Sequence, residues 1–201
     1  MPIRANARSS FVQNTQKLDH WARRVAEAAE GDRIVLLDVD TMILRPLDDV
    51  WDREFDFAYT TKRGARLPFN AGVIGLRVSD RVRAFVTEWA TENRRLLLQN
   101  PHKGASHDWR HRYAGINQGA LAHILGTMGS TLRIETLPCA EWNCEDSSWA
   151  SYDPATTRIV HVKSDLRVAC FRPDQARGSL MPLVEQWRTL DGQASRESRV
   201  A

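Results

Sequence analysis

The sequence has few cysteines and no long apolar run. Its three cysteines, Cys139, Cys144 and Cys170, are an odd number and form no C-x-x-C pair, which argues against a disulfide framework and against a zinc knuckle. Its apolar runs, such as residues 34–37, are far shorter than the roughly 20 residues that cross a bilayer. The polar, basic N-terminus lacks the apolar stretch of a secretory signal. We therefore expect a cytoplasmic protein with no transmembrane segment.

Lysine is also scarce, because only four of the 28 basic side chains are lysines. The arginines are spread along the chain and form no five-residue basic block, whereas nucleic-acid binding needs a clustered basic patch. We therefore expect no nucleic-acid partner. The length of 201 residues, with 42% hydrophobic and 26% charged residues, is typical of one folded globular domain.

Apolar periodicity predicts alternating helices and strands, and hence an α/β fold with a mixed, mostly parallel sheet flanked by helices. Residues 33–37 are a continuous apolar run, typical of a strand covered on both faces and therefore parallel. We expect disorder over 1–14 and 191–201 and one domain over 15–190. The other expected strands cover 55–61, 71–76, 132–137 and 158–162, and the expected helices cover about 16–30, 79–97, 115–125 and 174–190. Ser79 is expected to cap the helix at 79–97, whose apolar residues fall on one stripe.

The segment Asp38-Val39-Asp40 follows the apolar strand at 33–37. In an extended chain, residues i and i+2 point to the same side, so both carboxylates would converge at a sheet edge, where open α/β folds bind ligands. Carboxylate oxygens suit Mg²⁺ or Mn²⁺, which keep open positions for substrate phosphates. Taken alone, the pair is equally consistent with one aspartate that caps a turn and one that is solvated.

Five segments, in order along the chain, resemble GT-A glycosyltransferases of the glycogenin and bacterial lipopolysaccharide-sugar transferase group (glycosyltransferase family 8-like). Residues 36–47, LLDVDTMILRPL, resemble the "LDADTLVLRPL" segment of that group. Residues 69–73 resemble its "FNAGV" strand, and residues 115–121 resemble its "DQ..LN" helix start. Leu137-Pro138 with Trp142-Asn143 resembles its "LP..(Y/W)N" stretch, and residues 159–161 resemble its "IxH". The resemblance therefore implies a GT-A-like, Rossmann-like fold.

The resemblance also implies roles for residues at the matching positions. Asp38, Asp40 and His161 match the ligands of a Mn²⁺ or Mg²⁺ ion. Gln118 and its neighbour Asn117 match the catalytic positions near the reacting sugar carbon, although Asn117 stands where the family has an aspartate. The donor-binding set is Asp38, Asp40, Asn70, Ala71, Gly72, Lys163 and Arg167.

The activity that the resemblance implies is transfer of a hexose from a nucleotide-diphosphate sugar, expected to be a UDP-sugar, to a hydroxyl acceptor. Retention at the anomeric carbon is expected, and the acceptor would be a saccharide or another hydroxyl compound. The sequence is also compatible with peripheral association at a membrane surface.

The sequence departs from this family at two places. Residues 162–167 lack the usual glycine and the Lys-Pro-Trp that contact the diphosphate, so either Lys163 or Arg167 is expected to take that role. Only 37 residues precede Asp38, whereas each βαβ unit takes about 30 residues, so the N-terminal nucleotide-binding half is expected to be missing or abbreviated.

Two other interpretations remain open at this point. A haloacid-dehalogenase-type phosphatase would use Asp38 as nucleophile and Asp40 as acid and base, although Met42 and the lack of a downstream acidic pair fit it less well. A non-catalytic transferase-fold fragment would serve as a binding or assembly module. We also expect a polar loop from Gln99 to Tyr113, in which Trp109 is a candidate for stacking on an acceptor sugar.

Overall fold

The computed structural model describes residues 10–61, 69–98 and 116–197. Contacts between Cα atoms group them into two compact units, whereas one domain over 15–190 is expected from the sequence. Unit 1 contains the described chain up to Leu37 and from Asp48 to Leu137, and unit 2 contains Asp38–Leu47 and the described chain from Pro138 onward. The predicted loop at 99–113, with Trp109, lies outside the described residues.

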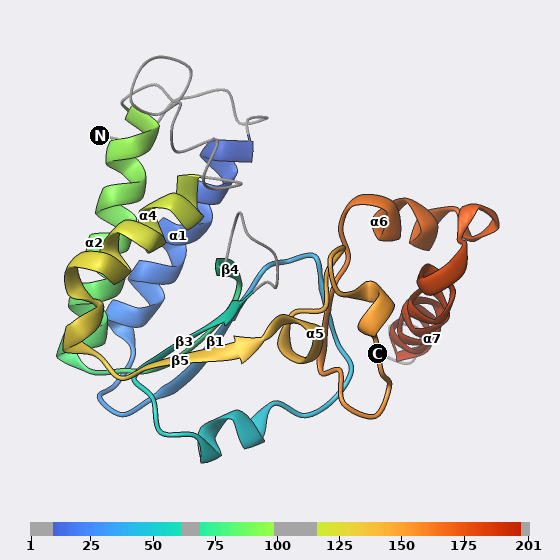
Figure 1. Ribbon diagram of the computed structural model, residues 1–201, viewed down its shortest axis with the longest axis horizontal. Helices are drawn as coiled ribbons and strands as arrows, with labels where there is room; N and C mark the ends of the chain where they lie inside the picture. Colours follow the sequence, from blue (N-terminus) through green and yellow to red (C-terminus); the bar gives the residue numbers. More distant parts are fainter. Residues whose placement is uncertain (1–9, 62–68, 99–115, 198–201) are drawn as a thin grey trace. The chain divides into compact units, whose positions relative to one another are not determined.

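Unit 1 places three helices along one face of a four-stranded sheet (Figure 1). The sheet order is β1-β4-β3-β5, with β1 at Arg33–Leu37, β3 at Phe57–Thr61, β4 at Phe69–Arg77 and β5 at Ile134–Pro138. The helices are α1 (Ser10–Glu27), α2 (Asp80–Leu98) and α4 (Ile116–Met128). Two short 3-10 helices, η1 (Asp48–Asp52) and η2 (Gly129–Thr131), complete the unit.

The α/β class is confirmed, but the strand directions differ in detail from the mostly parallel sheet that was expected. β1 pairs antiparallel with β4, which also pairs antiparallel with β3. The central strand β4 is the fully covered one, since seven consecutive residues of it are buried, whereas β1 lies at the edge of the described sheet and is mostly half-buried. The apolar run at 33–37 therefore predicted a strand correctly, but neither its direction nor its coverage on both faces.

Aromatic packing joins the sheet of unit 1 to its helices. The Phe57 ring on β3 lies 4.8 Å from the Phe85 ring and 6.3 Å from the Trp89 ring, both on α2. All three side chains are fully buried. The start of α2 matches its predicted cap, because the backbone N–H of Val82 donates to Ser79 Oγ at 3.3 Å. The apolar stripe predicted from Ser79 onward is therefore the core face of α2.

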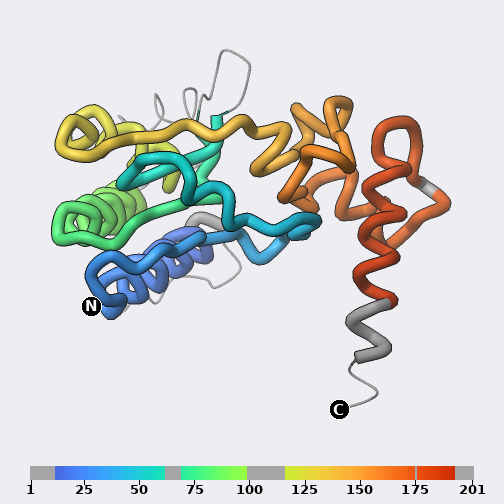
Figure 2. Tube along the Cα trace, turned by 90° about the horizontal axis from the view of Figure 1, so that it is seen from below, coloured from blue at the N-terminus to red at the C-terminus, as the bar shows by residue number. Residues whose placement is uncertain are grey.

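Unit 2 is built around a two-stranded antiparallel ladder, β2 (Thr41–Ile43) with β6 (Ile159–His161). The helices of this unit are α5 (Cys139–Trp142), α6 (Ser164–Phe171) and α7 (Met181–Glu197), and its 3-10 helices are η3 (Trp149–Ser151), η4 (Pro173–Gln175) and η5 (Gly178–Leu180). Beyond α6 the chain folds back, so that α6 and α7 pack together (Figure 2). Buried Leu166 and Leu183 hold the two helices against a core that contains Val160.

Helices α1 and α7 extend into segments at the two ends of the chain that were expected to be disordered. α1 begins at Ser10, inside the predicted segment 1–14, and α7 continues to Glu197, inside the predicted segment 191–201. Val12 on α1 is buried, so the first turns of this helix contribute to the core. The start of α1 was expected to be disordered because its residues are mostly polar.

Candidate metal and donor site

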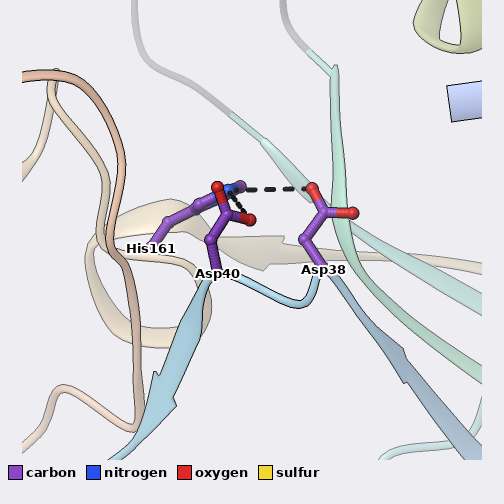
Figure 3. A group of neighbouring side chains, drawn as sticks. All are labelled: Asp38, Asp40 and His161. Carbon is purple, nitrogen blue, oxygen red and sulfur yellow. Dashed lines mark hydrogen bonds and ion pairs between the residues drawn. The ribbon is translucent and has the colours of Figure 1, made fainter. Parts of the chain in front are cut away.

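Two aspartates and a histidine meet in unit 2 (Figure 3). His161 Nε2 lies 3.1 Å from Asp40 Oδ1 and 3.7 Å from Asp38 Oδ2. One ligand-type atom from each of the three side chains lies within 4.8 Å of the others. The His161 side chain is buried, whereas both carboxylates remain partly exposed. The group is therefore fixed on one side and accessible from the other.

The β2–β6 ladder places this group. Thr41, next to Asp40, is paired directly with His161, and the backbone N–H of Val162 donates to Asp40 O at 2.7 Å. Asp38 and Asp40 lie on a turn between β1 and β2, and the Thr41 hydroxyl donates to Asp38 O at 2.8 Å to hold that turn. The two carboxylates thus converge through a turn, not through the alternation of an extended strand that the sequence suggested.

The electrostatics of the site favour ionised Asp40. Burial by itself raises the pKa of the Asp40 carboxyl, but the hydrogen bond and charge of His161, a backbone hydrogen bond and the Arg167 guanidinium together bring it below its ordinary value. Arg167 Nη2 forms a close ion pair with Asp40 Oδ2. A carboxylate that stays ionised is available as a hard oxygen ligand at neutral pH.

The donor set fits a divalent ion of the Mn²⁺ or Mg²⁺ type. Two carboxylates supply hard oxygen atoms, and an imidazole is a nitrogen ligand that Mn²⁺ accepts alongside them. Within residues 10–61, 69–98 and 116–197, no further Asp, Glu, His or Cys joins this group. The site therefore combines one histidine with two carboxylates. In the described part of the chain it lacks the additional acidic residues with which a phosphatase of the dehalogenase type would hold magnesium.

The two candidate diphosphate-binding cations have different surroundings. Arg167 contacts the Asp38, Asp40 and His161 group through its ion pair with Asp40. Its Nε also donates to Val162 O at 3.2 Å. Lys163 Nζ lies 2.6 Å from Glu145 Oε2, whose side chain is fully buried, and 3.4 Å from Asp146 Oδ1. The structure therefore brings Arg167, and not the ammonium of Lys163, into contact with the predicted metal ligands.

The backbone between His161 and α6 has an unusual conformation at Ser164. Its φ of 46° is the one positive value among the described non-glycine residues, and this left-handed region normally favours glycine. The segment 162–167 is also where the family resemblance expects a glycine. Ser164 thus adopts a glycine-type conformation at the turn that carries Lys163 and leads to Arg167.

The remaining predicted donor residues belong to unit 1 and lie on β4. Asn70 is buried, and its Oδ1 accepts the backbone N–H of Gly72 at 2.9 Å, while its backbone O accepts the Thr60 hydroxyl at 2.9 Å. Ala71 is buried. The β3–β4 register shifts between Tyr59, which pairs with Ile74, and Thr60, which pairs with Asn70, so residues 71–73 form an irregularity in this pairing. The Asn70 carboxamide oxygen supports this backbone, and its role toward a sugar stays a prediction.

The predicted catalytic pair opens helix α4 of unit 1. Asn117 Oδ1 accepts the backbone N–H of Gln118 at 2.8 Å, and Asn117 O accepts Trp89 Nε1–H at 2.8 Å. Gln118 Oε1 is buried and has no hydrogen-bond partner among the residues that the structure describes. A buried acceptor of this kind ordinarily finds a partner, so Gln118 keeps an acceptor that a ligand hydroxyl could satisfy.

Two residues around His161, Asn143 and Glu145, have no role predicted from the sequence. Asn143, buried within the Trp142-Asn143 segment of the resemblance, has its Oδ1 3.2 Å from His161 Nδ1. Glu145, the partner of Lys163, carries no sequence signal, because an isolated glutamate is most often solvated. Asn143 could have been singled out from its place in the quoted motif.

Comparisons with protein-family models and with curated proteins found no match. The solved structures that are similar to this chain include two glycosyltransferases. One is a glycosyltransferase involved in the glycosylation of the major capsid of PBCV-1, with 10% identity, a TM-score of 0.54, and coverage of 94% of this chain and 80% of that one. The other is the galactosyltransferase LgtC in complex with donor and acceptor sugar analogues, with 14% identity, a TM-score of 0.55, and coverage of 96% of this chain and 70% of that one. The expected GT-A-like glycosyltransferase fold is thereby confirmed.

None of the helices in the described part of the chain has the length and apolar character that spanning a membrane requires.

Proposed function

We propose that this chain is a metal-dependent glycosyltransferase that moves a hexose from a nucleotide-diphosphate sugar to a hydroxyl acceptor. The observation that supports this most strongly is the Asp38, Asp40 and His161 group, found in a chain with the fold of glycosyltransferases. A UDP-sugar is the donor we expect, with retention at the anomeric carbon, a saccharide or other hydroxyl acceptor, and a cytoplasmic location.

In this proposal Asp38, Asp40 and His161 hold Mn²⁺ or Mg²⁺. Such an ion, when bound, neutralises the charge that develops on the leaving diphosphate. Arg167 is the cation that we assign to the diphosphate, because its guanidinium already contacts Asp40 and a planar guanidinium matches phosphate geometry. Lys163 would add positive charge from the same turn.

The sugar-facing roles rest on the residues of unit 1. Gln118 would offer its buried Oε1 to a hydroxyl of the donor sugar, and Asn117 would keep the first turn of α4 in place through the hydrogen bond to the Gln118 N–H. Asn70, Ala71 and Gly72 would line the donor pocket with backbone and carboxamide groups.

Calorimetric titration with UDP and with GDP, each with and without Mn²⁺, tests the proposal. Binding of either nucleotide that requires the metal is the expected result and identifies the base. The variant Asp40→Asn should lose this binding while keeping its circular dichroism spectrum. Asp174→Asn, which removes the same charge from an exposed position of unit 2, is the matched control and should bind as the wild type does.

Three outcomes would contradict the proposal. Metal-dependent nucleotide binding that survives in Asp40→Asn would show that the aspartate pair is not the metal site. A folded wild-type protein that binds neither nucleotide would instead favour a non-catalytic relative. Release of phosphate from a small phosphomonoester, lost in Asp38→Asn, would favour the phosphatase interpretation.

A further inference from the structure

The imidazole of His161 is held at both of its nitrogens. Nδ1 lies 3.2 Å from Asn143 Oδ1, and Nε2 lies 3.1 Å from Asp40 Oδ1. The side chain is only 8% exposed, so the ring has little freedom to turn. The nitrogen on the Asn143 side faces the protein interior, whereas the other faces the two carboxylates.

Asn143 is itself fixed by the fold. It is fully buried and ends helix α5, with its backbone N–H donating to Cys139 O at 2.9 Å. The next residue, Cys144, bridges to Val160 of β6, and the backbone N–H of His161 donates to Cys144 O at 2.8 Å. Backbone hydrogen bonds therefore tie the segment that carries Asn143 to the strand that carries His161.

We propose that Asn143 is the positioning residue of the metal centre, with its carboxamide oxygen accepting the Nδ1–H of His161. A neutral imidazole has one donor nitrogen and one acceptor nitrogen. Nε2 faces Asp38 and Asp40 and, without a metal, donates its proton to Asp40 Oδ1. With an ion bound, the hydrogen bond at Nδ1 would keep the remaining ring proton on Nδ1 and leave the Nε2 lone pair for the metal. This inference rests on the proposed metal site and names the residue that orients its nitrogen ligand.

The chemistry of Asn143 suits this role. A carboxamide oxygen accepts a hydrogen bond without adding a charge, so the site keeps the two carboxylates as its only described acidic ligands. Partners of this kind, which bond the second nitrogen of a ligating histidine, fix its tautomer and ring orientation, and their removal typically weakens metal affinity by about 10- to 100-fold. The same loss is expected here.

The test is titration of the protein with Mn²⁺, followed by the electron paramagnetic resonance signal of the free ion. Asn143→Ala should bind Mn²⁺ about 10- to 100-fold more weakly than the wild type. Asn143→Asp keeps an acceptor at the same position and should recover most of that loss. The control is Asn93→Ala in unit 1, where another fully buried asparagine donates from Nδ2 to Thr15 Oγ1 at 2.8 Å; it should reduce stability but leave Mn²⁺ affinity unchanged.

The outcomes separate this inference from the proposed function. If the wild type binds Mn²⁺ and Asn143→Ala binds it equally well, the positioning role is wrong while the metal site stands. If the wild type binds no Mn²⁺, the metal site is wrong and the positioning role falls with it.

A second measurement does not depend on the variants being folded. In the wild type loaded with diamagnetic Mg²⁺, ¹⁵N spectra of the His161 ring should show the proton on Nδ1. A proton on Nε2 in that complex would overturn the inference.

Discussion

Replacing Lys163 with methionine should destabilise the protein substantially, because it removes the cation beside a buried carboxylate. The Glu145 side chain is 0% exposed, and its Oε2 lies 2.6 Å from Lys163 Nζ. Breaking a buried ion pair by removing one partner costs about 3–5 kcal/mol. Glu145 would keep hydrogen bonds from the backbone N–H and the hydroxyl of Ser147, and the Lys163 side chain is 26% exposed. We therefore expect the lower end of that range, about 3 kcal/mol.

Urea denaturation of Lys163→Met, Glu145→Gln and the double variant measures this effect. The double variant should be more stable than the sum of the single losses predicts, because no unpaired charge stays buried. Arg94→Met is the matched control. It breaks the exposed Arg94–Asp19 pair, in which the arginine side chain is 49% exposed, and should cost at most about 1 kcal/mol. If Lys163→Met loses no more stability than Arg94→Met, the buried pair does not stabilise unit 2 and the reasoning is wrong.

Three further predictions concern other parts of the chain. Ser164→Gly should raise the free energy of unfolding by about 0.5–1 kcal/mol, measured in urea, because glycine adopts the observed φ of 46° without steric cost. Burial raises the pKa of Cys144 to about 12 and that of Cys170 to about 11, so neither thiol should react with Ellman's reagent at pH 8 before unfolding; fast reaction of either in the folded protein would contradict this. The hydrogen bond from Arg133, which outweighs partial burial, lowers the pKa of Asp56. Its contribution to stability should be complete above the ordinary pKa of about 3.9 and lost as the pH falls through the lowered pKa; Arg133→Ala should move the Asp56 titration, followed by NMR, to higher pH.

The longer elements were predictable from the sequence because each one carries its own periodic signal. The strand at 33–37 and the helix after Ser79 appear where apolar pattern and capping chemistry place them. Short elements such as β2, α5 and α6 were not expected. They are too brief to show a period, and tertiary contacts hold them in place.

The predicted metal ligands come together because strand pairing joins segments that are far apart in the sequence. The family resemblance predicted that these segments meet, whereas residue spacing alone could not. Glu145 illustrates the opposite case. Its burial depends on the fold around it, and its partner Lys163 lies 18 residues along the chain. Strand direction was also beyond local pattern, since the antiparallel pairing of β1 with β4 depends on the connection between them.

The discontinuity of unit 2 has a consequence for how the chain matures on the ribosome. The ten-residue piece that contains both aspartates leaves the exit tunnel early, but its pairing partner, β6, is synthesised more than 100 residues later, since Thr41 pairs with His161. The metal-type centre therefore cannot assemble vectorially. It forms late, after the intervening strands and helices have been made. A divalent ion bound there would link the two pieces of unit 2 and would raise the free energy of unfolding by RT ln(1 + [ion]/Kd).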